Sequence, residues 1–403
     1  MLIVKKFGGS SVANKERVFN VAKKIIKDYE RGHQIVVVLS AQGDTTDELI
    51  NKAKEINPNP SKREMDMLYT TGEQQSVSLM AMALEYLGYP AISLNSFQVG
   101  MHTTSVYSNS RIKRIDSDRV INELERKNIV LVTGFQGVNR YDDYTTLGRG
   151  GSDTTAVALA AALNADKCEI YTDVDGVYTA DPRMVDTAKK LVEITYDEML
   201  ELATLGAKVL HNRSVELAKK YNVDLVVRSS MSEAEGTLVK EECKMEKMIV
   251  SGVAADKNTA RIAIIGIKDE PGKAFELFSL MSKNHINVDI ILQSIGRNGT
   301  KDISFTVAED NADEAISLIE KDLGRISGER VECDKSVSKV SIVGAGMQSN
   351  AGVASIMFEA LYDEGINIQM ISTSEIKITV LIEERYTKEA MNAIHDAFKL
   401  GRR

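Results

Sequence analysis

Leu147-Gly148-Arg149-Gly150-Gly151-Ser152-Asp153-Thr154-Thr155 is a glycine-rich stretch followed by the apolar run 156–163. Glycines let the backbone approach an anion closely, and the run predicts a helix that starts near Thr154. Backbone N–H groups at a helix start can face a phosphate, and Arg149 offers a planar fork for a carboxylate or phosphate. The stretch therefore predicts an anion-binding loop, and a glycine turn before a core helix is the alternative that it leaves open.

Length and composition limit the class of protein. The 403 residues predict two or three domains, and the net charge of −8 argues against nucleic acid as a partner. Cys168, Cys243 and Cys333 are widely spaced and odd in number, which fits a reducing cytoplasm and no disulfide framework. No segment of signal-peptide length and no apolar run of about 20 residues is present. We expect a cytoplasmic protein with no membrane partner.

The N-terminus predicts a strand, a glycine loop and a helix. Residues 2–4 predict a buried strand that runs into Lys6-Phe7-Gly8-Gly9-Ser10-Ser11, and apolar positions in 18–26 form a helical stripe. Ligands of α/β sheets bind beyond the carboxyl ends of strands, so Lys6 can reach a phosphate there. A solvated strand-end cation is the alternative. Because the lysine precedes the glycines, this is not a Walker A loop.

A second strand leads to small hydroxyl residues. The run 35–39 predicts a strand covered on both faces, and Ser40 to Thr46 follow it. They suit a polar ligand, although one threonine can instead cap a helix that begins near Asp47. Residues 65–87 predict a long helix interrupted at 70–73, where Glu73 can bind an ammonium group or remain a solvated helix charge.

Alternating strands and helices continue to residue 230. Residues 91–94 and 129–132 predict strands, the latter followed by a glycine turn at 134–137. The alternation predicts a mostly parallel sheet flanked by helices. Residues 167–183 predict a strand and a loop whose mixed polar side chains suit a nucleotide, although Asp-Gly and Asp-Pro also form ordinary turns. Residues 206–211 predict a helix that carries Lys208 and a structural His211.

These motifs, in this order, resemble the amino acid kinase family. Arg63-Glu64-Met65-Asp66-Met67, Thr71-Gly72-Glu73 and Gly134-Phe135-Gln136-Gly137 narrow the resemblance to aspartokinases. It implies a three-layer αβα amino acid kinase fold with a mostly parallel sheet over residues 1–240. It also implies transfer of phosphate from ATP, with Mg²⁺, to the β-carboxylate of L-aspartate, giving 4-phospho-L-aspartate. This is the first step of lysine, threonine and methionine biosynthesis.

The resemblance also implies the roles of individual residues, and it names no protein ligand for the metal. The implied catalytic residues are Lys6, Asp153 and Lys208. Those implied to bind aspartate are Ser40, Thr46, Glu73, Arg149 and Ser152, with Glu73 on the ammonium group and Arg149 on the α-carboxylate. Those implied to bind ATP are Lys6, Phe7, Gly8, Gly9, Thr172, Asp173, Tyr178, Asp181, Pro182, Arg183, Lys208 and Val209. Gln42 and Asn212 depart from the methionine and proline common in the family.

The second half contains an internal repeat. Residues 262–287 and 342–367 align at an offset of 80, and Gly272 matches Gly352. Each copy predicts the ferredoxin-like βαββαβ pattern. The repeats resemble the two ACT domains of aspartokinases, over 259–335 and 336–403. Because no strand follows the last helix, the segment 246–256 is predicted to complete the second sheet.

The resemblance implies regulation by an end-product amino acid, lysine or threonine or both, at the paired repeats. The implied effector-binding residues are Asp269, Asn287, Val288, Asp289, Gln293 and Asn367. It also implies a homo-oligomer, a dimer or tetramer, formed through the ACT domains. Three alternatives stay open at this point: repeats that only dimerise, a kinase of another amino acid such as glutamate, and an amino-acid-sensing protein with an inactive kinase domain.

Overall fold

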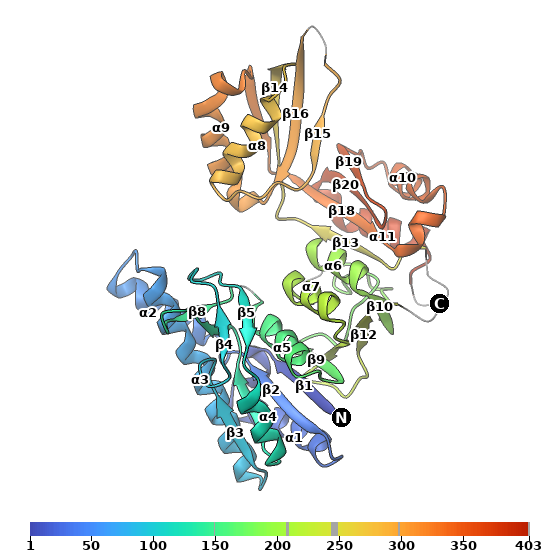
Figure 1. Ribbon diagram of the computed structural model, residues 1–403. Helices are drawn as coiled ribbons and strands as arrows, with labels where there is room; N and C mark the ends of the chain where they lie inside the picture. The colour runs from blue at the N-terminus through green and yellow to red at the C-terminus, as the bar shows by residue number, and fades with distance from the viewer. Residues whose placement is uncertain (149, 207–208, 243–248, 297–298, 402–403) are drawn as a thin grey trace. The chain divides into compact units, whose positions relative to one another are not determined.

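The computed structural model describes residues 1–148, 150–206, 209–242, 249–296 and 299–401, without the side chains of Gln348 and Ser349. The chain forms two compact units (Figure 1). The first comprises Met1–Val177, Lys190–Thr204 and Lys208–Met245, and the second comprises Tyr178–Lys189, Leu205–Ala207 and Glu246–Arg403. No helix within the described ranges is long and apolar enough to cross a membrane.

An eight-stranded sheet forms the centre of the first unit. Its strand order is β10-β12-β11-β9-β1-β2-β6-β3, and all neighbours are parallel except β11 and β12. The strands are β1 (Leu2–Phe7), β2 (Gln34–Leu39), β3 (Ala91–Leu94), β6 (Ile129–Thr133), β9 (Lys167–Thr172), β10 (Glu193–Thr195), β11 (Leu225–Ser229) and β12 (Thr237–Lys240). The mostly parallel sheet predicted from the sequence is confirmed.

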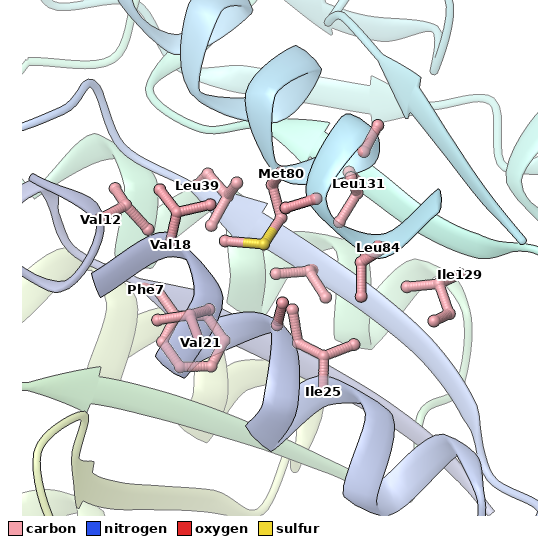
Figure 2. Packing of buried hydrophobic residues seen from close by; sticks show 14 of the residues in the cluster. Phe7, Val12, Val18, Val21, Ile25, Leu39, Met80, Leu84, Ile129 and Leu131 are labelled. Atoms are coloured by element: carbon pink, nitrogen blue, oxygen red, sulfur yellow. The ribbon is translucent and has the colours of Figure 1, made fainter. Parts of the chain in front are cut away.

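Helices cover both faces of this sheet. The helices of the unit are α1 (Lys15–Tyr29), α2 (Thr45–Ile56), α3 (Lys62–Tyr86), α4 (Asp118–Glu125), α5 (Gly151–Ala162), α6 (Tyr196–Thr204) and α7 (Asn212–Tyr221). On one face, apolar side chains of α1 and α3 pack on those of β1, β2 and β6 (Figure 2). On the other face, α5 packs against β1, β2 and β9. Residues 35–39 are therefore buried on both sides, as their unbroken apolar run predicted.

Helix α3 runs without a break through the glycine, so the predicted interruption at 70–73 is wrong. The hydroxyls of Thr70 and Thr71 donate to carbonyls one turn earlier in the helix. A Cβ at Gly72 would lie 2.9 Å from the Cβ of Ala41. Glycine is present here because α3 passes close to the loop that follows β2, and not because the helix ends.

The first unit also holds a small antiparallel-rich sheet that the sequence did not predict. Its order is β5-β4-β7-β8, with β4 (Met101–Thr103), β5 (Ile112–Ile115), β7 (Gln136–Val138) and β8 (Tyr144–Thr146). Of the predicted glycine turn at 134–137, only residues 134 and 135 connect β6 to β7, and residues 136 and 137 belong to β7. Strand β8 leads directly into the glycine-rich stretch and α5.

Three predicted helix positions are corrected. Helix α2 begins at Thr45, whose hydroxyl donates to the carbonyl of Gln42, so neither threonine caps a helix at Asp47. Helix α5 begins at Gly151, three residues before the predicted start. The described part of 206–211 is not helical, because Gly206 has φ +102° after α6 and His211 is the extended N-cap of α7.

The second unit contains two four-stranded sheets with their helices. The first sheet has the order β15-β16-β14-β17, and the second has the order β13-β18-β20-β19. The elements are β13 (Gly252–Asp256), β14 (Ala260–Lys268), α8 (Lys273–Lys283), β15 (Ile291–Gln293), β16 (Thr300–Val307), α9 (Ala312–Ile326), β17 (Arg330–Asp334), β18 (Val337–Val343), α10 (Val353–Asp363), β19 (Met370–Thr373), β20 (Lys377–Glu383) and α11 (Thr387–Ala397). Helices α8 and α10 start 80 residues apart, each after a left-handed glycine, as the repeat predicted.

The two sheets differ in how they obtain their fourth strand. In the first, β17 follows α9 in the chain and pairs antiparallel with β14. In the second, β13 precedes both repeats and pairs antiparallel with β18, the counterpart of β14. Within the segment predicted to complete the second sheet, Gly252–Asp256 therefore forms its edge strand. The residue boundaries of the three proposed domains remain a prediction.

The segment Tyr178–Lys189 belongs to the second unit, although it precedes β10 in the chain. Ala180, Val185 and Ala188 pack in the hydrophobic cluster of the β18 sheet. The Thr179 hydroxyl lies 2.9 Å from Nε2 of the buried His395 in α11. The sequence placed this segment in the catalytic domain because nothing local to it shows where its apolar side chains pack.

Candidate active site

Lys6 and Asp153 form an ion pair at the end of β1. Lys6 Nζ lies 2.6 Å from Asp153 Oδ1, and the two side chains are 13% and 12% exposed. Alternation along β1 turns Lys6 toward α5, while its neighbours Lys5 and Phe7 turn toward α1. Asp153 stands in the first turn of α5, so the pair joins the strand end to the start of the helix.

Ser40 and Ser152 extend this cluster across the carboxyl ends of β2 and β6. Their hydroxyl oxygens are 3.0 Å apart. A Cβ at Gly134, directly after β6, would lie 2.6 Å from Ser152 Oγ, so only glycine lets the chain pass here. The serines predicted to bind substrate are therefore adjacent to each other and next to the Lys6–Asp153 pair.

Glu73 is a buried carboxylate with an unused oxygen. It is 3% exposed, and its Oε1 accepts a long hydrogen bond of 3.4 Å from the N–H of Ala41. Its Oε2 has no hydrogen-bond partner among the described residues. Burial raises the pKa of Glu73 to about 7, because few donors offset the loss of water around the charge. A ligand ammonium placed here would restore that solvation.

The start of α5 presents backbone N–H groups near these side chains. Its N-cap, Gly150, has φ +66°, and a Cβ there would lie 2.2 Å from the ring of His211. Aligned N–H groups at a helix N-terminus favour anions. Arg149 and Lys208, two of the predicted site residues, lie outside the described residues.

Four more residues predicted for this site lie near the ends of β1 and β2. Gly8 and Gly9 lie in the turn after β1, and Thr46 lies in the first turn of α2. Phe7 is fully buried and its ring stacks on Tyr171 with centroids 4.4 Å apart. The Phe7 ring is therefore part of the core, and the role of Phe7 in binding ATP remains a prediction.

The predicted nucleotide residues are distributed over both units. Thr172 ends β9, and its hydroxyl donates to Asp173 over 2.8 Å. Val209 lies in the turn before α7. In the second unit, the Arg183 guanidinium forms a two-point contact with Asp181, which lowers the pKa of that carboxyl. Tyr178 packs against the hydrophobic cluster of the β18 sheet, and Pro182 is exposed.

The predicted effector residues lie in the second unit. Asn287, Gln293 and Asn367 are exposed, and Val288 packs against the core of the first repeat. Both carboxylates already contact lysines of the chain: Asp269 is 3.0 Å from Lys301 Nζ, and Asp289 is 2.6 Å from Lys339 Nζ. A ligand ammonium at either carboxylate would share it with that lysine.

Sequence reasoning missed two ionisable side chains that hold the site's loops, the buried Asp66 and the half-buried Arg213. Asp66 in α3 accepts hydrogen bonds from Ser108 and Thr146. The Arg213 guanidinium in α7 donates to the carbonyls of Leu147 and Ser110 over 2.9 and 2.8 Å. Asp66 was part of a recognised motif, but only the folded chain shows what it contacts.

This arrangement suits transfer of a phosphoryl group to an anionic acceptor. It offers a lysine, hydroxyls and helix N–H groups around one point, and a buried carboxylate for an ammonium group. Within the described residues, no group of three His, Cys, Asp or Glu side chains could hold a metal ion.

The fold and this site define a kinase of the amino acid kinase class with a regulatory half. The model of the "Amino acid kinase family" matches residues 1–229, and the "ACT domain" model matches residues 262–323 and 340–398. The sequence-based prediction of an αβα kinase fold followed by two ferredoxin-like domains is confirmed.

Similar proteins narrow the class. The chain is 50% identical over 401 residues to the aspartokinase of Bacillus sp. (strain MGA3), covering 99% of this chain and 98% of that one. It is 25% identical to E. coli aspartokinase III solved with aspartate and ADP (R-state), with a TM-score of 0.83 and coverage of 98% and 99%. The same enzyme solved with lysine and aspartate (T-state) has a TM-score of 0.78 and the same identity and coverage. The chain belongs to the aspartokinases.

Proposed function

We propose that the chain transfers the γ-phosphoryl group of ATP to the β-carboxylate of L-aspartate and forms 4-phospho-L-aspartate. The observation that carries the proposal is a buried oxygen of Glu73 that has no hydrogen-bond partner among the described residues. It lies beside the cluster of Ser40, Ser152, Lys6 and Asp153. The ligands of the similar E. coli enzyme, aspartate and ADP, match the proposed acceptor and the nucleotide that remains after transfer. The acceptor carboxylate is ionised at neutral pH, so the reaction needs no general base.

In this proposal the chain positions two anions and offsets their charge. The β-carboxylate oxygen attacks the γ-phosphorus in line while the bond to the ADP oxygen breaks, and the electron pair leaves with ADP. Lys6 and the N–H groups that open α5 stabilise charge on the transferring group. Asp153 holds the Lys6 ammonium in place. Gly8 and Gly9 let the backbone after β1 approach the phosphates.

Aspartate is held by the opposite side of the cluster. Glu73 binds its ammonium group, Ser40 and Ser152 bind its carboxylates, and Thr46 contributes a hydroxyl from α2. Arg149 binds the α-carboxylate with its two-pronged guanidinium. The burial of Glu73 supports its role, because a buried carboxylate with few donors is costly unless a cation joins it.

The nucleotide is held by Thr172, Asp173, Tyr178, Asp181, Pro182, Arg183, Lys208 and Val209. Lys208 would add a second ammonium group near the phosphates. When bound, Mg²⁺ supplies positive charge to the phosphate oxygens. We name no protein ligand for it.

A direct assay separates this function from its alternatives. Purified enzyme is incubated with ATP, Mg²⁺ and hydroxylamine, which traps acyl phosphates as hydroxamates. We expect hydroxamate with L-aspartate and at least a hundredfold less with L-glutamate, whose extra methylene moves the carboxylate out of line. Equal turnover of glutamate would indicate a different amino acid kinase, and no turnover of either would indicate an inactive kinase domain.

We further propose feedback control through the second unit. Lysine, threonine or both would bind at the first repeat through Asp269, Asn287, Val288, Asp289 and Gln293, with Asn367 at the matching position of the second. Lysine is a ligand of the similar E. coli enzyme in its T-state, which supports a lysine site. ACT domains that associate edge to edge would make the chain a dimer or tetramer. A ligand inhibits there only if it binds one quaternary state more tightly.

A further inference from the structure

Asp66 is a fully buried carboxylate that the proposed reaction does not use. It lies in α3, and its relative exposure is 0%. Oδ2 accepts from the backbone N–H groups of Ser108 and Thr146 over 2.8 and 2.9 Å. Oδ1 accepts from the Thr146 hydroxyl over 2.8 Å and from the Ser108 hydroxyl over 3.3 Å. All four of these donors are neutral.

The donors belong to two chain segments that Asp66 ties together. Ser108 lies between β4 and β5, and Thr146 is the last residue of β8. The N–H and hydroxyl of Ser110 both donate to the Thr146 carbonyl, so the two segments also contact each other. Ser108 has φ +65°, a conformation that few non-glycine residues adopt without support. Asp66 supplies that support through both polar groups of Ser108.

The two segments that donate to Asp66 contact the glycine turn just before α5. A Cβ at Gly148 would lie 3.2 Å from the Ser108 carbonyl oxygen, so Ser108 packs on the glycine turn. The Gly148 carbonyl in turn accepts from the N–H of Gly151, the first residue of α5. Ser152, which contacts Ser40, follows. The contact made by Asp66 is thus transmitted through a short, closely packed segment.

The same helix carries Glu73. Asp66 and Glu73 are seven residues apart in an unbroken helix, so they lie on one side of it and about 10 Å apart along its axis. Helix α3 therefore carries Glu73, the proposed ammonium site. Through Asp66 it also holds the segment that joins β8 to α5, the helix that carries Ser152. These two sites would contact opposite ends of one small molecule.

We propose that Asp66 is a positioning residue that sets the spacing between Glu73 and the first turn of α5, and thereby the affinity for aspartate. The inference rests on the proposed function, in which Glu73 and Ser152 bind that substrate. Asp66 touches neither substrate nor cofactor in this scheme. Its effect should fall on the KM for aspartate and spare the KM for ATP.

The hydrogen-bond geometry distinguishes two substitutions. Backbone N–H groups cannot rotate, so an Asp66→Asn side chain must place its amide oxygen where Oδ2 lies. Its NH₂ group then faces the two hydroxyls, which can rotate and accept. Asp66→Asn can keep all four contacts, whereas Asp66→Ala leaves two buried N–H groups without a partner.

The test begins with the wild-type enzyme, which must phosphorylate aspartate before the variants have meaning. We expect Asp66→Ala to raise the KM for aspartate about tenfold and to change the KM for ATP less than about twofold. Asp66→Asn should stay within about threefold of the wild type for both substrates. If the wild type is inactive, the proposed function fails, whereas an active wild type whose variants behave otherwise overturns only this inference.

A matched pair of variants distinguishes loss of the Asp66 contact from a general loss of stability. Thr146→Val removes one hydroxyl that binds Asp66, and Thr145→Val removes one that binds the Thr103 hydroxyl over 2.6 Å instead. Both threonines are buried in β8. We expect a severalfold rise in the KM for aspartate with Thr146→Val alone.

Several results would overturn the inference. A parallel rise of both KM values in Asp66→Ala, or equal effects of the two threonine variants, would indicate a role only in stability. An Asp66→Asn enzyme as impaired as Asp66→Ala would show that the charge, and not the hydrogen-bond geometry, matters.

Discussion

The affinity for aspartate should depend on pH through Glu73. The pKa of this buried carboxyl is raised to about 7, and only the ionised form can pair with a substrate ammonium group. The ionised fraction is then about 0.9 near pH 8 and about 0.1 near pH 6. At saturating ATP and Mg²⁺, the KM for aspartate should therefore rise about tenfold when the pH is lowered from 8 to 6.

The same shift makes a calorimetric prediction. Binding of aspartate to a protonated Glu73 must release that proton, so about 0.8 proton per site should appear near pH 6.5 and about 0.1 near pH 8. Titration calorimetry in buffers of different ionisation enthalpy measures this number. Aspartate itself has no group that titrates in this range.

The stability consequence has a definite sign. The folded-state pKa of Glu73 lies above the unfolded value, so the folded chain binds more protons between about pH 4.5 and 7. Above about pH 7, ionised Glu73 lowers the free energy of unfolding by about 3 kcal/mol. Below about pH 4.5, Glu73 is protonated in both states and this penalty vanishes. Glu73→Gln should raise Tm near pH 8 while it raises the KM for aspartate at least tenfold.

Two controls make the reasoning refutable. Glu64, an exposed carboxylate in the first turn of the same helix, should leave both pH profiles unchanged when it is replaced in Glu64→Gln. The Glu73→Gln enzyme should have a KM for aspartate that no longer varies between pH 6 and 8. A wild-type KM that is flat over this range, or binding without proton release near pH 6.5, would show that Glu73 does not bind the ammonium group.

Three further outcomes are expected. Lys6→Ala should fold normally and lose about a hundredfold in kcat, since its charge matters most in the transition state, and an enzyme within about threefold of the wild type would remove Lys6 from the mechanism. Arg149→Lys should raise the KM for aspartate far more than that for ATP, because lysine lacks the guanidinium fork, and the opposite pattern would assign Arg149 to the phosphates. Gln293→Ala and Asp289→Ala should leave uninhibited turnover nearly intact and weaken inhibition by lysine or threonine, with Gln293 the cleaner test because Asp289 also contacts Lys339. If neither amino acid alters the activity or the Tm of the wild type, the regulatory proposal fails.

Local sequence was sufficient where one short segment carries its own information. The apolar run 35–39 predicted a doubly covered strand, and the offset of 80 residues predicted two copies of one fold with matching helix starts. Lys6 at a strand end beside glycines predicted its place at the carboxyl edge of the sheet. For the strand and for Lys6 the signal acts within about ten residues, and the repeat requires only that two segments be compared, so no distant contact had to be known.

Several local signals were misleading because a distant segment decided the outcome. Gly72 looked like a break in a helix, yet the helix continues and the glycine lets Ala41 approach. Nothing near Phe7 in the sequence shows that its ring packs on Tyr171 of β9, a strand about 160 residues away.

By itself, the sequence determined the class of each half, the order of most strands and helices, and the residue types that could bind phosphate and aspartate. Tertiary structure alone decided that Glu73 is buried with an oxygen that no described residue hydrogen-bonds, and that Asp66 accepts hydrogen bonds from two separate segments. It also decided that the segment Tyr178–Lys189 packs in the hydrophobic cluster of the β18 sheet. The physical reason is common to all three: burial and hydrogen-bond partnership depend on which distant segments meet, and hydrophobic periodicity records only that a side chain is covered, not by what.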